Sequence, residues 1–135
     1  MRAAAKLLAP RTIRVLAMPQ LSPTMSVATI EAIHLDVGSL VKSYDLALEV
    51  STKQLTSTQG DDVLSRLQVE VLEDDLTVRK LFARVGDTLA VGEPIAILAD
   101  GSAELDLERI GDQTPRALWQ AYVIDKNDSG ACGCN

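Results

Sequence analysis

Residues 29–50 read TIEAIHLDVGSLVKSYDLALEV, and residues 77–98 read TVRKLFARVGDTLAVGEPIAIL. Aligned without a gap, both stretches begin with threonine, both place Val-Gly at the same interval, and both carry an acid, Asp45 or Glu93, at the same later position. Self-similarity of this kind is the signature of a repeated structural unit. The architecture therefore follows from what one copy forms and how two copies pack.

Each copy has the pattern of two short strands joined by a turn. Apolar and polar residues alternate at 33–37 and again at 46–50, which is typical of strands with one buried face. Gly38 and Gly86 mark the turns, and Pro94, which lacks an amide hydrogen, belongs at a strand start or a sheet edge. Neither copy can bury its apolar face alone. We therefore expect an all-β sandwich of two small antiparallel sheets with internal pseudo-two-fold symmetry.

The composition excludes several classes of function. The chain has 135 residues, which suits one domain. Its net charge of −6 argues against nucleic acid as the main partner, because phosphate binding needs clustered Lys and Arg. No apolar run reaches the roughly 20 residues of a transmembrane helix. Cys132 and Cys134 lie far along the chain from the single histidine, His34. We therefore expect reduced thiols there and no metal site.

Other polar residues do not form the pattern of an active site. We expect Asp61-Asp62 and the acidic run 73–75 to be solvated surface, and His34 to point outward between two apolar neighbours. No Ser/His/Asp set, phosphate-binding glycine loop or Cys-His pair is present in the sequence. The sequence therefore predicts no catalytic residues, and we expect that the chain is not an enzyme.

Residues 1–16 form a basic segment without acids. Its charged residues are Arg2, Lys6, Arg11 and Arg14. An N-terminus of this kind is typical of a mitochondrial targeting peptide, whereas a secretory signal needs a longer apolar stretch. We expect residues 1–16 to direct import into the mitochondrial matrix and the folded domain to begin near Ala17. The alternative is a basic arm that stays on the mature protein and docks to a partner.

A motif follows that segment and reads Met18-Pro19-Gln20-Leu21-Ser22-Pro23-Thr24-Met25. This opening motif resembles the opening strand of lipoyl domains from the acyltransferase component of the pyruvate dehydrogenase complex, which begin Met-Pro-x-Leu-Ser-Pro-Thr-Met. The resemblance covers residues 18 to about 100. It implies a flattened barrel of two small sheets and a mitochondrial 2-oxo-acid dehydrogenase ancestry. We therefore divide the chain into a targeting segment, 1–16, a lipoyl-like domain, 17–100, and a C-terminal extension, 101–135.

The resemblance also implies a position for the cofactor. Lipoyl domains attach lipoate through an amide to the lysine of Glu-Thr-Asp-Lys-Ala at a hairpin tip, and the lipoyl group then does the chemistry. Counted without a gap, these residues correspond here to Ser51-Thr52-Lys53-Gln54-Leu55. A glutamine amide is not nucleophilic, so Gln54 at the lysine position predicts no lipoate. The alternative is attachment at Lys53, which requires a tip that has lost one residue, because a one-residue shift reverses the face of a side chain.

Two segments exceed an ordinary lipoyl domain. The first is an insertion near 57–66, which is long for a hairpin. The second is the C-terminal extension, whose most apolar stretch contains Leu118, Trp119 and Tyr122. Aromatic residues are frequent in binding hot spots, so these three are candidate partner-binding residues. The alternative is that the stretch folds back on the domain's own sheet.

These observations predict a non-catalytic, unlipoylated lipoyl-like domain that serves as a structural or docking subunit of a mitochondrial multiprotein complex. Its partners are then other subunits of that complex, with no direct contact to nucleic acid and no transmembrane segment. The 2-oxo-acid dehydrogenase complexes, the respiratory complexes and the mitochondrial ribosome all remain candidates. The alternative function is a lipoyl carrier domain of a 2-oxo-acid dehydrogenase complex, modified at Lys53.

Overall fold

Alternating apolar residues form strands throughout the part of the chain that the structure describes, namely residues 12–56, 63–100, 110 and 114–124 of a computed structural model. No helix occurs in these ranges, so they contain no helix that could cross a membrane. The strands are β1 (Ile13–Ala17), β2 (Val27–Ile33), β3 (Leu40–Val41), β4 (Asp45–Thr52), β5 (Ser65–Val71), β6 (Leu76–Leu81), β7 (Thr88–Ala90), β8 (Pro94–Ala99) and β9 (Trp119–Ile124).

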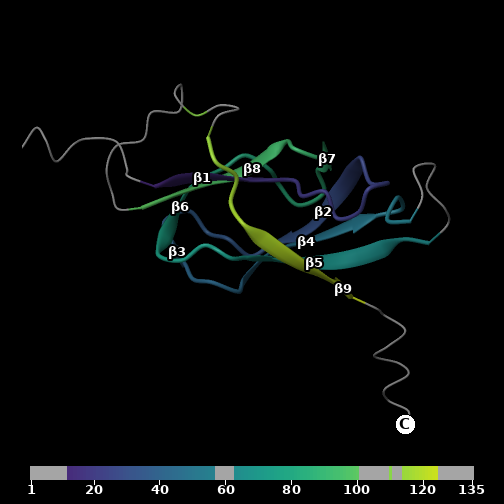
Figure 1. Ribbon diagram of the computed structural model, residues 1–135, viewed down its shortest axis with the longest axis horizontal. Coiled ribbons are helices and arrows are strands. Elements are labelled where there is room, and N and C mark those ends of the chain that lie inside the picture. Colours follow the sequence, from purple (N-terminus) through teal and green to yellow (C-terminus); the bar gives the residue numbers. More distant parts are fainter. Residues whose placement is uncertain (1–11, 57–62, 101–109, 111–113, 125–135) are drawn as a thin grey trace, which may run out of the picture.

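The strands form two antiparallel sheets that lie one over the other (Figure 1). One sheet has the order β1-β8-β6-β3, and the other has the order β7-β2-β4-β5-β9. Neither sheet closes on itself into a barrel. The expected all-β sandwich of two small sheets is therefore confirmed.

The two sheets are related by the sequence repeat. Replacing β3, β6, β8 and β1 by their counterparts β7, β2, β4 and β5 converts the order of the first sheet into that of the second, and leaves β9 as an addition. The turn glycines show the same symmetry, because the Gly38 amide donates to Val78 O (2.7 Å) and the Gly86 amide donates to Ile30 O (2.8 Å). Each repeat thus holds the turn of the other. This confirms the internal pseudo-two-fold symmetry.

A single apolar core lies between the sheets and includes residues of both repeats. Its side chains come from alternate positions of the strands, as on β5, where Leu67, Val69 and Val71 are all buried. Ile30 and Val78, which are equivalent in the repeat, are both fully buried. Burial of apolar surface between two sheets is the main stabilising term for such a fold.

Several local expectations are also confirmed. The expected strand at 46–50 lies within β4, and Pro94 is the first residue of β8. Gly38 and Gly86 have φ of 94° and 97°, which is the left-handed region that favours glycine. The expected strand at 33–37 is wrong, since β2 ends at Ile33. Leu35 lies in the loop that follows β2 and is buried, whereas His34 and Asp36 are exposed. This burial of Leu35 accounts for the alternating pattern in the sequence.

The N-terminal part of the fold differs from the expectation. The opening strand is β1, which lies before the opening motif and overlaps the segment 1–16 that we assigned to targeting. Val15 and Leu16 are buried, and β1 pairs with β8 from Ile13 to Ala17. The opening motif itself is a turn: its two prolines have no amide hydrogen for a strand ladder, and the Met25 amide donates to Ser22 O. Residues 1–11 lie outside the described residues.

Candidate functional site

The hairpin tip between β4 and β5 is the position at which the resemblance places the cofactor. β4 ends at Thr52 and β5 begins at Ser65, so residues 53–64 form the tip, of which 57–62 lie outside the described residues. Lys53 is exposed, whereas Gln54 and Leu55 are half-buried, and Leu55 packs against the core. The two candidate positions, Lys53 and Gln54, therefore lie in different environments.

The Gln54 side chain is fixed against the end of the opening motif and the start of β2. Its Oε1 accepts hydrogen bonds from the Ser26 backbone amide (2.9 Å), the Ser26 hydroxyl (2.9 Å) and the Val27 backbone amide (3.1 Å). One carbonyl oxygen thus serves three donors. A lysine ammonium has no acceptor, so it could not make any of these hydrogen bonds.

The backbone of the tip is held by the same region. The Thr24 hydroxyl lies 2.8 Å from Gln54 O and 3.0 Å from Leu55 O, and 3.1 Å from the Ser22 hydroxyl. On the other side, the buried Thr52 hydroxyl donates to Val27 O (3.0 Å) and accepts from the Gln54 amide (3.0 Å). Side chains of the opening motif therefore position the tip.

Gln54 and Lys53 differ in their ability to form an amide with lipoate. Gln54 has no amine, and its carbonyl oxygen is engaged by Ser26 and Val27, so its side chain cannot form an amide link to lipoate. The Lys53 side chain is exposed and carries a primary amine, which is the group that an amide link requires. The structure therefore leaves Lys53 as the chemically competent residue of the pair.

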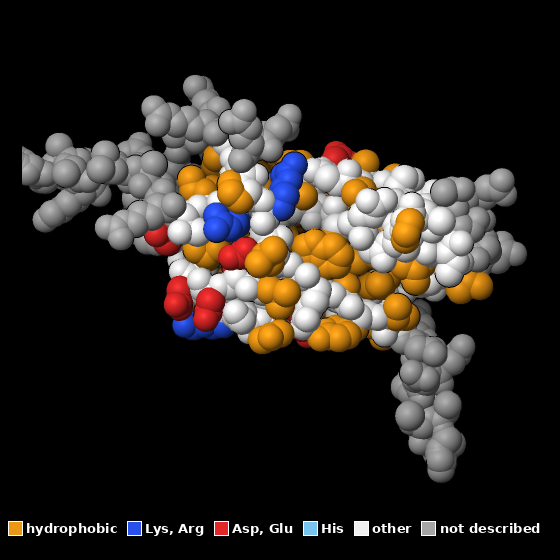
Figure 2. Space-filling view, in the orientation of Figure 1, with side chains coloured by type: hydrophobic (Ala, Val, Ile, Leu, Met, Phe, Trp, Pro, Cys, Tyr) orange, Lys and Arg blue, Asp and Glu red, His pale blue; other side chains and the backbone are white. Residues whose placement is uncertain are grey.

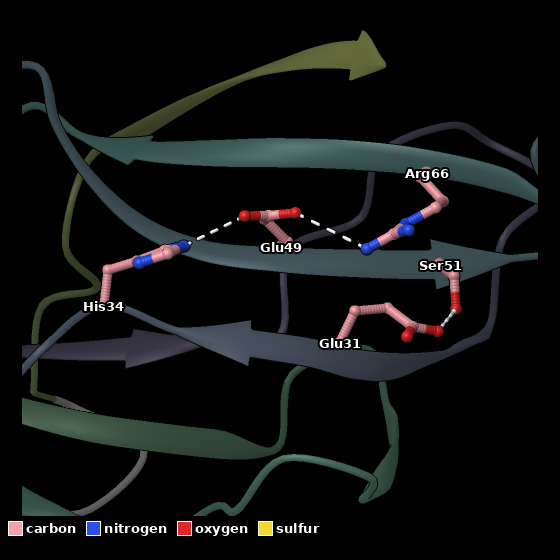
Figure 3. Close-up of polar contacts among 5 residues, drawn as sticks. All are labelled: Glu31, His34, Glu49, Ser51 and Arg66. Atoms are coloured by element: carbon pink, nitrogen blue, oxygen red, sulfur yellow. Dashed lines mark hydrogen bonds and ion pairs between the residues drawn. The ribbon is translucent and has the colours of Figure 1, made fainter. Parts of the chain in front are cut away.

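A second group of polar residues lies on the outer face of the five-stranded sheet (Figure 3). Glu49 on β4 lies between two basic side chains: its Oε2 is 3.0 Å from His34 Nε2, and its Oε1 is 3.5 Å from an Arg66 guanidinium nitrogen. Nearby, the Ser51 hydroxyl donates to Glu31. His34 is exposed, as expected. These contacts join β2, β4 and β5, and we assign the group a structural role.

The acidic run 73–75 is only partly solvated surface. Asp74 and Asp75 are exposed, and the Asp75 carboxylate lies 2.6 Å from Lys42 Nζ, a hydrogen bond that raises the pKa of Lys42. Glu73 differs from them, because its Oε2 accepts from the Leu118 amide (2.9 Å) and lies 3.6 Å from Arg14 Nε. Glu73 thus links β1 to the C-terminal extension. No sequence signal indicated this role, since the three acids are adjacent and alike.

Residues 114–124 of the C-terminal extension are part of the fold. Arg116 forms a parallel bridge with Val15, with the Val15 amide donating to Pro115 O and the Ala117 amide to Val15 O. Next, β9 pairs antiparallel with β5 over its whole length (Figure 1). Residues 115–124 therefore contact β1 of one sheet and β5 of the other. The domain thus continues beyond the boundary that we expected near residue 100.

The three candidate partner-binding residues differ in how exposed their side chains are. Trp119 is half-buried and packs against the core, as the alternative interpretation of this stretch predicted. Leu118 and Tyr122 remain 62% and 51% exposed. Of the three, Leu118 and Tyr122 can reach a partner without a change in the domain, and Trp119 is held by its own sheet.

The remaining expectations concern metal ligands, the acidic pair in the insertion and the two cysteines. In the described ranges, no three His, Cys, Asp or Glu side chains come together as a metal site would require. Asp61, Asp62, Cys132 and Cys134 lie outside those ranges.

Comparison with known proteins relates the chain to one component of a mitochondrial complex. No protein-family model matches the chain. It is 35% identical over 124 residues to the mitochondrial pyruvate dehydrogenase complex protein X component of Saccharomyces cerevisiae. The alignment covers 92% of this chain and 27% of the yeast protein, so the chain spans about a quarter of that relative. The similarity agrees with the pyruvate dehydrogenase relationship indicated by the opening motif.

Proposed function

We propose that this chain is a non-catalytic docking subunit of a mitochondrial pyruvate dehydrogenase complex, built on a lipoyl-like domain that carries no lipoate. The observation that carries the proposal is Gln54, which stands at the lysine position and is held there by the Ser26 and Val27 amides. A side chain with a structural role of its own has replaced the group that lipoate attachment needs. The domain is thereby left as a folded surface for contacts with other subunits.

The similarity to the yeast component supports the choice of complex. A respiratory complex and the mitochondrial ribosome were equally compatible with the sequence, but neither has support from the comparison. The proposal places the protein in the mitochondrial matrix, among the other subunits of the dehydrogenase complex. It gives the chain no catalytic step.

Affinity purification tests this proposal. The full chain with a C-terminal tag, expressed in its own organism, should recover pyruvate dehydrogenase subunits from isolated mitochondria in quantitative mass spectrometry. An unrelated tagged matrix protein serves as the control. Recovery of ribosomal or respiratory subunits without dehydrogenase subunits would overturn the choice of complex.

A second candidate function is supported by one observation, the exposure of Lys53 at the hairpin tip. In this candidate, lipoate is linked through an amide to Lys53 and supplies the acyl-carrying dithiolane. The chain then contributes a folded carrier and the tip on which the lysine is presented. Lys53→Arg keeps the positive charge but removes the primary amine, so it should abolish lipoylation in this candidate and change nothing in the first.

A further inference from the structure

Thr12, the first residue that the structure describes, is joined to the end of β8. Its backbone amide donates to Asp100 Oδ1 (3.1 Å), and the Asp100 amide donates back to Thr12 O (3.1 Å). Both residues are half-buried. The two hydrogen bonds extend the pairing of β1 with β8, which covers Ile13 to Ala17, by one residue toward the N-terminus. The fold therefore holds the chain from Thr12 onward.

The acceptor that faces the Thr12 nitrogen is a carboxylate and not a backbone carbonyl. In the uncut chain this nitrogen belongs to a neutral amide. A positively charged donor at the same place would add the attraction between opposite charges to the hydrogen bond. The Asp100 carboxylate thus fits an ammonium better than the amide that it contacts.

Asp100 also differs from other acids of the fold in its lack of a basic partner. On the face shown in Figure 2, acidic and basic side chains lie side by side. Glu73 lies 3.6 Å from Arg14 Nε, and Asp75 lies 2.6 Å from Lys42 Nζ. No ion pair of the described residues includes Asp100. Its carboxylate is therefore available to a cation at the start of β1.

The fold limits where the basic N-terminal segment can be removed. Val15 and Leu16 are buried, and the Arg14 guanidinium contacts both Ile13 O and Glu73. A cut after Arg14 would remove two residues of β1 together with these contacts. Arg11 immediately precedes Thr12. A cut after Arg11 leaves β1 and the Thr12–Asp100 pair complete.

We propose that the Arg11–Thr12 peptide bond is the processing site of this chain, and that the new Thr12 α-ammonium pairs with Asp100. The inference rests on the proposed location in the mitochondrial matrix, where a peptidase that cuts after arginine hydrolyses the bond. One water is consumed as the bond between the Arg11 carbonyl carbon and the Thr12 nitrogen breaks. Arg11 then ends in a carboxylate, and Thr12 begins with an ammonium. This nitrogen already lies 3.1 Å from Asp100 Oδ1, so the ion pair forms without a backbone movement.

Incubation of the purified full chain with a mitochondrial matrix extract tests the bond. N-terminal sequencing should find Thr12 as the first residue, and Arg11→Gln should lower the yield of this N-terminus at least about tenfold. Lys6→Gln is the matched control, because it removes a basic residue of the same segment and should be cut at the same bond.

Two results of this incubation would overturn the proposal. One is a different N-terminus, and the other is an uncut chain in an extract that processes a control matrix precursor. Neither result depends on the complex that the protein joins. Failure to recover dehydrogenase subunits in the affinity purification would likewise leave the identity of the processing site unchanged.

Amine labelling tests the pairing with Asp100. Chains that begin at Thr12 carry the same α-amine in the parent and Asp100→Asn forms, and only the neutral amine reacts with a succinimidyl ester. A nearby carboxylate favours the protonated form, so Thr12 should react at least about threefold more slowly in the parent than in Asp100→Asn. Asp36→Asn, at an exposed acid in the loop after β2, should react as the parent does. Equal rates in the parent and Asp100→Asn, read from the mass of the N-terminal peptide, would show that Asp100 does not hold the ammonium.

Discussion

Gln54 Oε1 lies 2.9 Å from the backbone nitrogen of Ser26, and this contact joins the hairpin tip to the end of the opening motif. The Thr24 hydroxyl reinforces the connection from the other side through Gln54 O and Leu55 O. The motif that resembles lipoyl domains and the residue that departs from them are thus physically connected. Gln54 therefore contributes to the fold, in addition to the loss of an attachment site that we propose for it.

The first prediction concerns the acceptor at Gln54. Gln54→Met keeps the length of the side chain but leaves the Ser26 and Val27 amides without this partner. We expect the free energy of unfolding to fall by about 1–2 kcal/mol, since a net hydrogen bond contributes about 0.5–1.5 kcal/mol. Gln54→Glu retains an acceptor and should lose clearly less. Urea denaturation measures both variants, and equal stability of Gln54→Met and the parent chain would show that the contact stabilises nothing.

The second prediction separates the half-buried Trp119 from the exposed Tyr122. Removing a buried aromatic side chain costs about 3–5 kcal/mol, so Trp119→Ala should cost roughly half of that for a half-buried residue. Tyr122→Ala should change stability by less than about 0.5 kcal/mol. Thermal unfolding of the two variants under matched conditions gives the comparison. Trp119→Ala with unchanged stability would mean that Trp119 is available to a partner.

The third prediction concerns the N-terminus of the mature protein. Because Val15 and Leu16 are buried and β1 pairs with β8, processing should leave residues from Ile13 onward in place. A chain lacking residues 1–11 should keep the stability of the full chain, whereas a chain lacking residues 1–17 should lose it. N-terminal sequencing of the protein from mitochondria checks the site. A mature N-terminus beyond Ala17 on a stable protein would contradict the assignment of β1.

Import itself is tested separately from folding. A fluorescent fusion of residues 1–16 should reach mitochondria, and replacing its basic residues with glutamine should leave the fusion in the cytosol. Those basic residues are Arg2, Lys6, Arg11 and Arg14. Cytosolic fluorescence from the unmodified fusion would favour the basic arm that docks to a partner.

The fourth prediction follows from the pseudo-two-fold symmetry. Gly38 and Gly86 have nearly equal φ, 94° and 97°, and a Cβ added at either would meet nothing within 4 Å. The cost of Gly38→Ala and Gly86→Ala is therefore that of the backbone conformation alone, about 1–2 kcal/mol each. Chemical denaturation of the two variants should give values that agree within about 0.5 kcal/mol, the scatter of ordinary surface substitutions. A large difference would mean that the two turns are equivalent in geometry but not in energy.

The architecture could be predicted because most of the strands belong to the repeated unit. The Val-Gly pairs and the alternation at 46–50 indicate strand, turn and strand directly, and two copies imply two sheets. The limits of the fold were harder to predict. Arg14 and the buried pair Val15 and Leu16 lie together in β1, yet the surrounding basic residues favoured a targeting segment there.

The contacts of Gln54 could not be predicted from the sequence. Counting along the lipoyl-domain resemblance gives Gln54 as the expected lysine position, but its partners Ser26 and Val27 are distant in sequence and meet it through β2–β4 pairing. The C-terminal extension was ambiguous for a different reason. The stretch 118–124 is apolar on both strand faces, so its pattern cannot indicate whether Trp119 faces the core or a partner.

With Gln54 in place of the attachment lysine, the mature subunit should carry no lipoate. The intact mass of the protein purified from its own mitochondria, followed by fragmentation across Ser51–Leu55, measures this state. We predict the mass of an unmodified chain that has lost N-terminal residues but retains Ile13 onward, with Lys53 as a free amine. A mass increase equal to one lipoyl group and mapped to Lys53 would contradict the proposed function and establish the carrier function in its place.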